Sequence, residues 1–471
     1  MFWDSLPVEI QTHILEALVL HGDSARYASI CRAWQTIIEQ RIFARLKVTR
    51  SRLAGFSDIG YRHRHLVKYI WFSIEPSEYH CPHCGGVGVY NWHQVSSKTI
   101  RKAIQDLVIQ LSIWEPSGSL LLDISVKAPS GLMHSSSIIQ YGPPVISEPK
   151  KDKIIQCSHW LHDTSLQGPA AYLFNKTTNV SEPEPEPSQE MPKARAVTSL
   201  LLRRQTRHPW KSEVLEELLD LLPEVHEIHY EPWRDWRQME ERPTNITTMR
   251  LCKSLRSDQL RRMVIFENFH GNNPAMSLAV QAAEIDTAYA LVEASLGLEH
   301  LAASFVSDAS HFFDACQKWN IWPRLESLAL TSNVLKSQQQ SIYINDLLET
   351  IALVAMKMPR LKSMELWNGG AGFAGVFQYQ ISESDRTAKI TWRSTWDLLL
   401  EPRVLKAWQA GASERVDCKL QVVTEILDAN VVITSHGDAI RYLMLLNTVV
   451  HPVSLWQIQK ETAYQSKSRY P

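Results

Sequence analysis

The sequence predicts a mixed α/β (α+β) fold, in which a short N-terminal helical bundle precedes an irregular α/β solenoid. Residues 1–50 place apolar side chains at helical spacing. Residues 222–230, 322–330 and 358–366 share a frame of an apolar residue, Pro, a charged residue and then spaced apolar residues. Strand-like and helix-like stretches alternate around these segments at uneven intervals, so a conventional layered α/β sheet remains the alternative. With 471 residues, the chain has room for two or three domains.

The N-terminal segment contains two apolar stripes. Ile10, Ile14 and Leu18 recur every four residues, which predicts one face of a helix. After the break at residues 21–23, a second set follows at helical spacing: Tyr27, Ile30, Trp34, Ile37 and Ile38. So small a unit buries little surface by itself. It therefore packs on the rest of the chain or offers its apolar residues to a partner.

This segment resembles an F-box. The matching positions, in order, are Leu6, Pro7, Glu9, Ile10, Ile14, Leu18, Cys31 and Trp34. One departure lies between the helices, where the family usually has Asp-Leu and this chain has Asp23-Ser24-Ala25. The resemblance implies an F-box-like domain over residues 1–50 that binds the Skp-type linker protein of a cullin ligase. It assigns the linker-binding surface to Leu6, Pro7, Ile10, Ile14, Leu18, Cys31 and Trp34. The alternative is a helical hairpin docked on its own domain.

A possible zinc ligand pair follows a predicted strand at residues 65–74. His80, Cys81, His83 and Cys84 lie in a Pro- and Gly-containing loop, and Cys-x-x-Cys has half the ligand spacing of a structural zinc site. The second pair would have to come from Cys157 and His159, far along the chain. The favoured interpretation is a plain turn with reduced thiols, without metal or cofactor. A zinc-binding protein or enzyme using this cluster is the alternative.

The next region ends in an acidic, proline-rich run. Residues 98–111 predict a helix, and residues 119–126 predict a strand. Alternating Glu and Pro from residue 182 to 187 repel one another and offer nothing to bury. We therefore expect a disordered insertion at residues 177–193, between residues 51–176 and 194–471 of the repeat-like region; it either separates two domains or loops out of one.

The shared frame of the second half resembles a leucine-rich repeat. After the proline, apolar residues occupy positions 0, 3 and 5, as in Leu325, Leu328 and Leu330. Helical patterns precede these strands at residues 212–222, 273–296 and 344–358. The same spacing, complete or partial, recurs at Ile246–Leu251, at Leu298 with Leu301, and at Leu66, Tyr69 and Trp71. The frame predicts a leucine-rich-repeat-like α/β solenoid with uneven periods.

The C-terminal part predicts a hairpin and further elements. Residues 377–381 and 389–393 favour paired strands, and helices are expected at 403–410 and 438–449, with a strand at 431–434. Trp233, Trp236 and Trp367 follow predicted strands, where a solenoid binds partners. They are weak candidates for substrate binding, and packing against the next repeat is the favoured alternative.

Composition narrows the function classes. A formal net charge of -1 provides no basic field for nucleic acid or a membrane surface. Seven scattered cysteines fit a reducing compartment, and neither a secretory signal nor a membrane-length apolar run is present, so we expect a cytoplasmic or nuclear protein. The chain lacks a P-loop, a dinucleotide fingerprint and a Gly-x-Ser-x-Gly elbow, and we expect no enzyme.

Over its whole length the chain resembles F-box proteins of filamentous fungi that pair this N-terminus with a degenerate repeat domain. That similarity rests on stretches such as residues 304–309 and 392–396. It implies a substrate-recognition adaptor of a cullin-type ubiquitin ligase, in which the F-box holds the Skp-type linker and the repeats bind a protein substrate. A scaffold without a ligase link is a further alternative.

Overall fold

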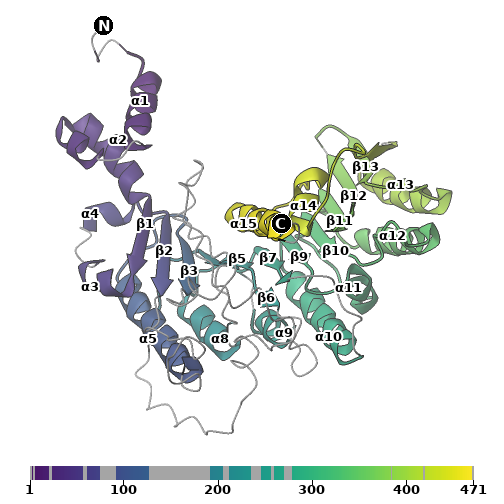
Figure 1. The fold of residues 1–471 in the computed structure, drawn as a ribbon, viewed down its shortest axis with the longest axis horizontal. Helices are drawn as coiled ribbons and strands as arrows, with labels where there is room; N and C mark the ends of the chain where they lie inside the picture. The colour runs from purple at the N-terminus through teal and green to yellow at the C-terminus, as the bar shows by residue number, and fades with distance from the viewer. Residues whose placement is uncertain are drawn as a thin grey trace. The chain divides into compact units, whose positions relative to one another are not determined.

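The computed structural model confirms a mixed α/β architecture (Figure 1). Two compact units can be distinguished and are described separately. The structure describes residues 3, 6–20, 24–56, 61–74, 92–126, 191–204, 210, 212–234, 245–255, 259–269, 278–382, 384–416 and 419–468.

The first unit begins with short helices. Their bounds are α1 (Val8–Leu20), η2 (Ser24–Ser29), α2 (Arg32–Phe43), η3 (Arg50–Arg52), α3 (Leu53–Phe56), α4 (Tyr61–Arg64) and α5 (Trp92–Ser112). In α5, buried Ile100, Ile104 and Leu111 recur at helical spacing, as the sequence predicts. This face of α5 therefore belongs to the core of the first unit.

The sheet of the first unit is parallel. Its strands, in spatial order, are β1 (Arg45–Thr49), β2 (Tyr69–Ile74), β3 (Leu121–Val126) and β4 (Ser199–Leu202). All six residues of β2 are buried, and β-branched and aromatic side chains suit such a strand. The predicted strands at 65–74 and 119–126 are thus confirmed with shorter bounds.

Strand β1 changes the expected end of the helical domain. We expect the helical domain to extend to residue 50, but Arg45–Thr49 pairs in parallel with Tyr69–Ser73. The helical segment ends at Phe43, and a domain cut at residue 50 would remove β1 from the sheet. Backbone pairing with β2 outweighs the weak helical pattern here.

The second unit is built on a larger sheet. Its strands, in spatial order, are β5 (Glu227–Tyr230), β7 (Arg262–Phe266), β9 (His300–Ser304), β10 (Ser327–Thr331), β11 (Ser363–Gly370), β12 (Phe373–Ser382), β13 (Thr387–Ser394) and β14 (Leu420–Ile426). A separate short pair joins β6 (Trp233–Arg234) to β8 (Asn268–Phe269). Neighbouring strands from β5 to β11 are parallel and follow chain order. The predicted hairpin is confirmed, because β12 pairs antiparallel with β11 and with β13.

The shared sequence frame becomes a ladder across this sheet. Position 3 of the three Pro-led frames (Ile228, Leu328 and Met364) lies in one row with Leu301 of the partial frame and with Met263 of β7, a strand that no predicted frame covers. All five side chains are buried. Burial of this row on one face of the sheet therefore specifies the strand register.

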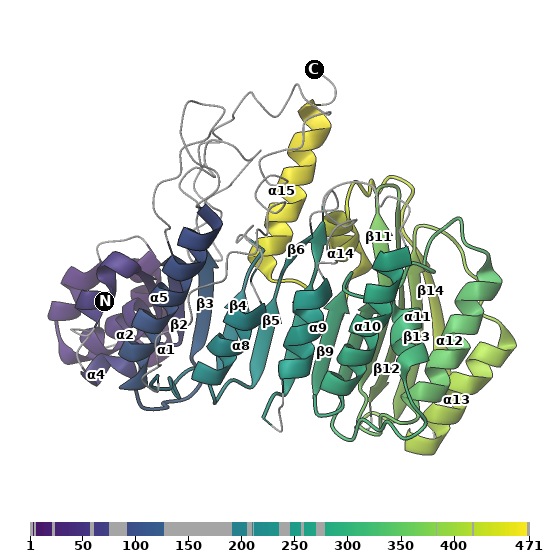
Figure 2. The same ribbon diagram turned by 90° about the horizontal axis from the view of Figure 1, so that it is seen from below.

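Helices lie on both faces of this second sheet (Figure 2). One face carries α9 (Asn245–Ser254), α10 (Leu278–Ser295), α11 (Ala309–Ala315), α12 (Ser341–Ala355) and α13 (Pro402–Val416). The opposite face carries α14 (His436–Leu443) and α15 (Pro452–Ser468), while α8 (Ser212–Leu221) connects β4 to β5. Small strand residues such as Ala302 and Ala329 pack with Ile440 and Leu443 of α14. Their size permits this close approach. We call residues 427–468, which contain α14 and α15, the C-terminal segment.

Several element predictions are confirmed and two are wrong. The helices expected at 212–222, 273–296, 344–358 and 403–410 correspond to α8, α10, α12 and α13. The spacing of Ile246–Leu251 lies in helix α9 and not in a strand, since apolar residues three apart also fit a helix. Residues 431–434 form an irregular segment and not a strand. Ile433 of this segment packs into the core. The helix expected at 438–449 ends at Leu443, where Met444 turns left-handed with φ 52°.

Some sequence predictions fall outside the described residues. The His80, Cys81, His83 and Cys84 cluster lies there, as do Cys157 and His159. So does most of the expected acidic insertion, up to residue 190.

Candidate functional site

The candidate linker-binding residues lie on the N-terminal hairpin of α1 and α2. Gln11 fixes the entry to α1, since its side-chain amide donates to the carbonyl oxygens of Trp3 (3.1 Å) and Leu6 (3.0 Å). Arg41 of α2 forms an ion pair with Glu16 of α1. These contacts join the two helices and position the segment before α1.

Helix α1 has two apolar sides. Leu15 is fully buried, as is Ile38 of α2. In contrast, Val8 is 69%, Ile10 45% and Ile14 39% exposed. Ile10 and Ile14 are one turn apart and share a side, whereas Leu15 lies about 100° around the helix from Ile14. The hairpin is thus held by one side of α1, and the predicted stripe faces solvent.

The other predicted linker residues are all at least partly exposed. Pro7 and Cys31 are exposed, and Leu6, Leu18 and Trp34 are partly buried. The Trp34 ring lies 4.8 Å from the Trp3 ring, centroid to centroid. Ile30, which precedes α2, is 57% exposed and was not assigned to the surface by the resemblance. We define the hairpin surface as Pro7, Ile10, Ile14, Ile30 and Trp34.

Charged groups beside the hairpin surface are paired. The hydrogen bond from Arg41 holds the pKa of Glu16 below its ordinary value. Hydrogen bonds from Gln35 and from His63 likewise lower the pKa of Glu39. Ion pairing therefore occupies the sides of the hairpin and leaves its exposed apolar residues uncovered.

The predicted substrate residues do not form one surface. Trp367 is fully buried in β11 and packs with Phe305, at 5.2 Å between ring centroids. It offers nothing to a substrate, because its neighbours β10 and β12 and the C-terminal segment enclose it. Trp233 begins β6, and its side chain and Trp236 lie outside the described residues.

Two buried carboxylates anchor the C-terminal segment of the second unit. Glu365 of β11 accepts four hydrogen bonds: from the Leu446 amide (2.7 Å), the Asn447 amide (2.8 Å), the Asn447 side chain (2.7 Å) and the Gln378 side chain (2.9 Å). Burial nevertheless raises the pKa of Glu365. The carboxylate satisfies donors in the turn that follows α14.

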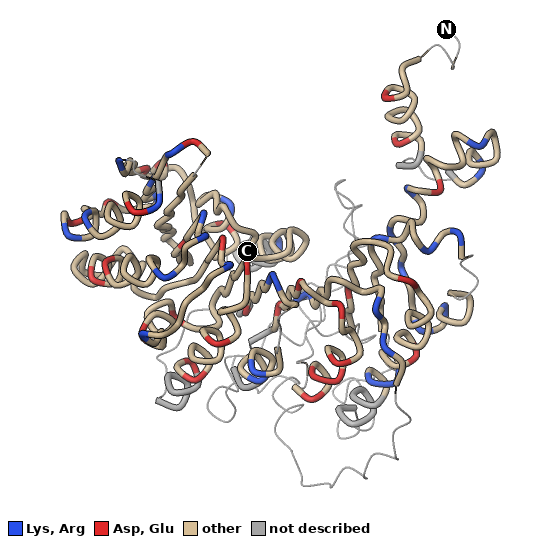
Figure 3. The backbone as a smooth tube through the Cα atoms, turned by 180° about the vertical axis from the view of Figure 1, so that it is seen from behind, with Lys and Arg blue, Asp and Glu red and all other residues tan. Residues whose placement is uncertain are grey.

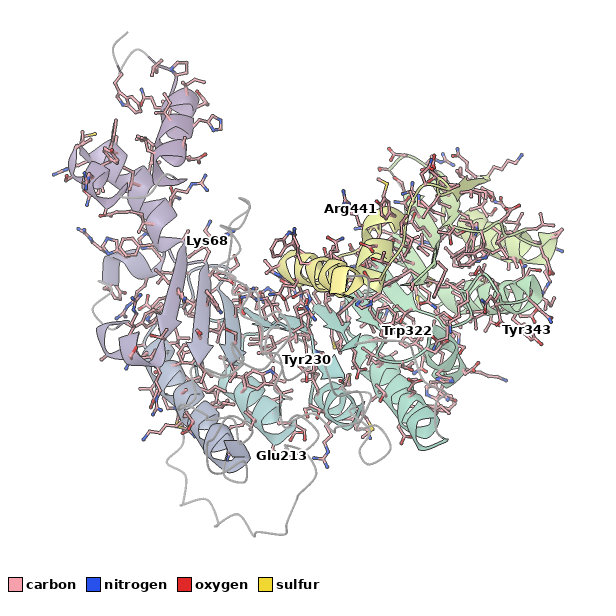
Figure 4. The ribbon with its side chains drawn as sticks, viewed as in Figure 1. Lys68, Glu213, Tyr230, Trp322, Tyr343 and Arg441 are labelled. Carbon is pink, nitrogen blue, oxygen red and sulfur yellow. The ribbon has the colours of Figure 1, made fainter. Side chains whose placement is uncertain are left out.

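Glu231 makes the second anchor, directly after Tyr230, which Figure 4 labels at the end of β5. It accepts hydrogen bonds from the backbone amides of His451 (2.7 Å) and Arg204 (3.1 Å) and from the Ser454 hydroxyl. His229 Nε2 lies 2.9 Å from its Oε1. Burial acts to raise the pKa of Glu231, but these partners outweigh burial and hold it at about 2. The start of α15 is therefore fastened to β5.

Sequence reasoning missed both anchors, although each left a signal. Glu365 interrupts the apolar frame within a strand that is otherwise buried, and Glu231 follows a frame that ends in Tyr230. A carboxylate at such a position requires a partner. The donors at residues 446, 447 and 451 could not be foreseen, because they lie more than 80 residues further along the chain.

The described residues contain no cluster of three or more His, Cys, Asp or Glu suited to holding a metal ion. Within the same part of the chain, the structure has no helix with the length and apolar character needed to cross a bilayer.

Residues 254–451 match a family model described as a family of unknown function (DUF6546). This segment lies in the second unit and runs from the end of α9 to the residue before α15. It thus includes Glu365 with its donors and His451, and it excludes the N-terminal hairpin. No curated protein matches the sequence.

Proposed function

We propose that this protein is a substrate-recognition adaptor of a cullin-type ubiquitin ligase. The N-terminal hairpin binds a Skp-type linker, and the second unit selects a protein substrate. We expect the protein to act in the cytoplasm or the nucleus.

The observation that carries the proposal is the exposed apolar side of α1. Burial of Leu15 already packs α1 into the hairpin, so the exposed Ile10 and Ile14 add nothing to the stability of the hairpin itself. Covering such groups with a partner contributes about 1.5 to 3 kcal/mol for each side chain that becomes fully buried. The F-box resemblance names the same two residues and identifies the partner.

The repeated frame supports the second half of the proposal. The five parallel strands β5, β7, β9, β10 and β11 alternate along the chain with the four helices α9 to α12, which fits a leucine-rich-repeat-like solenoid of uneven period. The antiparallel strands β12 and β13 then continue the sheet beyond the last repeat. Such a scaffold presents loops at its strand ends to a protein substrate.

The test is direct binding between the full-length protein and a purified Skp-type linker, measured by calorimetry and pull-down. We expect a one-to-one complex for the wild-type chain. Ile10→Asp combined with Ile14→Asp should weaken it at least about 100-fold, because two carboxylates would be desolvated at the contact. Both positions are exposed, so the fold should be retained.

Leu353→Asp is the matched control, since Leu353 is an exposed leucine on α12, in the other unit. It should leave linker binding unchanged. Circular dichroism and the melting temperature verify that each variant is folded. Absence of binding by the wild-type protein, or full binding by the folded Ile10→Asp/Ile14→Asp variant, would refute the proposal.

A further inference from the structure

The last strand of the second sheet has a free edge. Strand β14 (Leu420–Ile426) ends the strand order and pairs with β13 alone among the described residues. Val422 is 42% and Ile426 51% exposed. An uncovered edge of seven residues presents a row of backbone donors and acceptors to another strand.

The hydrogen-bonding phase of β14 identifies the residues that point outward. The Leu427 amide donates to the Ser394 carbonyl oxygen (2.8 Å), so odd-numbered residues direct their backbone groups toward β13. The Leu420 amide instead donates to the Gln409 side chain (2.8 Å), which fits the opposite phase. The outward N–H and C=O groups therefore belong to Val422, Thr424 and Ile426.

This edge lacks the usual protection against pairing. Proteins commonly place Lys, Arg or Pro on an edge strand. Strand β1, which ends the sheet of the first unit, carries exposed Arg45 and Lys47, and Figure 3 marks the Lys and Arg positions in blue. Strand β14 has none of these residues, and its single charge, Glu425, is paired with Arg393. Nothing on this edge repels a second strand.

The outward residues are self-complementary. In an antiparallel pair centred on Thr424, Thr424 faces Thr424 of the second copy, and Val422 faces Ile426 of the second copy twice. Each facing pair exchanges two N–H···O bonds in the phase that β14 leaves free. The exposed apolar side chains cover one another, and Glu425 faces Val423. No like charges meet in this register.

We propose that two copies of this chain associate through β14, antiparallel, about a twofold axis at Thr424. The contact is isologous, and it closes because each copy uses its only free β14 edge. One strand pair buries less surface than a permanent dimer, so association is reversible and depends on concentration. The proposal does not depend on the proposed ligase function.

The test is the mass of the full-length protein by light scattering or sedimentation, between about 1 and about 500 µM. We expect it to rise from 53.9 kDa toward twice that value. Thr424→Pro should abolish the rise and leave the fold intact, because the Thr424 N–H does not bond to β13 and an edge strand tolerates Pro at such a position.

Charge variants test the register. Val422→Lys with Ile426→Lys places Lys opposite Lys twice and should keep the protein monomeric. Val422→Lys with Ile426→Glu places Lys opposite Glu twice and should restore the dimer. Exposed Leu353→Lys on α12 is the control and should dimerise like the wild type.

The outcomes are decisive in either direction. A monomeric wild-type protein throughout the concentration range overturns the proposal, as does a dimer that persists in folded Thr424→Pro. If the Lys/Glu variant stays monomeric while folded, the Thr424-centred register is wrong. If β14 binds unrelated peptides but the protein does not self-associate, the partner of β14 is not a second copy of the chain.

Discussion

The backbone amide of His451 donates a 2.7 Å hydrogen bond to Oε1 of Glu231, which lies 220 residues earlier in the chain. The same carboxylate accepts from the Ser454 hydroxyl at the start of α15. A buried carboxylate at the end of β5 thus satisfies amide and hydroxyl donors at a helix N-terminus. This contact decides where the C-terminal segment crosses the sheet of the second unit.

Removal of this carboxylate should destabilise the second unit. We expect Glu231→Ala to lower the free energy of unfolding by about 3 kcal/mol, because buried donors lose their acceptor. Urea denaturation measures the loss. Hydrogen exchange should be faster at the His451 amide and at the Leu455 amide, which donates to the His451 carbonyl oxygen (2.9 Å). Glu414→Ala, at an exposed position on α13, is the control and should change stability by less than about 0.5 kcal/mol.

Acid should weaken the same anchor in two stages. Burial lowers the pKa of His451 from 6.5 to about 4, so its contribution is complete above pH 6.5 and is lost as the pH falls toward 4. The pKa of Glu231 is lowered from 4.5 to about 2, and its contribution is lost as the pH falls from 4.5 toward 2. Both shifts therefore make the protein less stable in acid.

Urea midpoints at pH 7, 5.5 and 4.5 measure the first stage. His451→Asn should flatten the profile between pH 6.5 and 4 and leave the lower stage in place. An unchanged slope in this variant would show that other groups control the acid response.

Trp367 should behave as a core residue. Its side chain is fully buried, so we expect Trp367→Ala to lower the free energy of unfolding by about 3 to 5 kcal/mol. Trp319→Ala is the contrast, because Trp319 is largely exposed and its removal should cost less than about 0.5 kcal/mol. Equal stability losses in the two variants would contradict this assignment.

Gly369 permits α14 to lie against β11. A Cβ at this position would overlap the Ala439 Cβ, so Gly369→Ala should destabilise the protein by about 1 to 3 kcal/mol. Adding Ala439→Gly should recover part of the loss, since it removes the clashing methyl group. Gly55→Ala is the control: a Cβ there meets nothing within 4 Å, and we expect unchanged or higher stability. Thermal or urea denaturation of the three variants and the wild type checks the order.

The sequence predicted much of the second sheet. The Pro-led frames correctly located β5, β10 and β11, because burial of positions 0, 3 and 5 leaves a local pattern. The hairpin of β12 and β13 was predictable for the same reason. The spacing failed at Ile246–Leu251, where it also fits a helix, and it missed the edge strands β1 and β14 and the central strand β7.

The candidate site, like the sheet, was predictable from the sequence only in part. Sequence alone named Ile10, Ile14 and Trp34, since a helical stripe and a family resemblance are both local properties. Only the tertiary structure decided that Leu15 holds the hairpin while Ile10 and Ile14 face solvent, and that Trp367 is enclosed. The anchors at Glu231 and Glu365 were likewise decided by tertiary structure, because their donors arrive from distant parts of the chain. Hydrophobic periodicity indicates which residues are buried. The partner of a buried charge depends instead on which distant segment of the chain packs beside it.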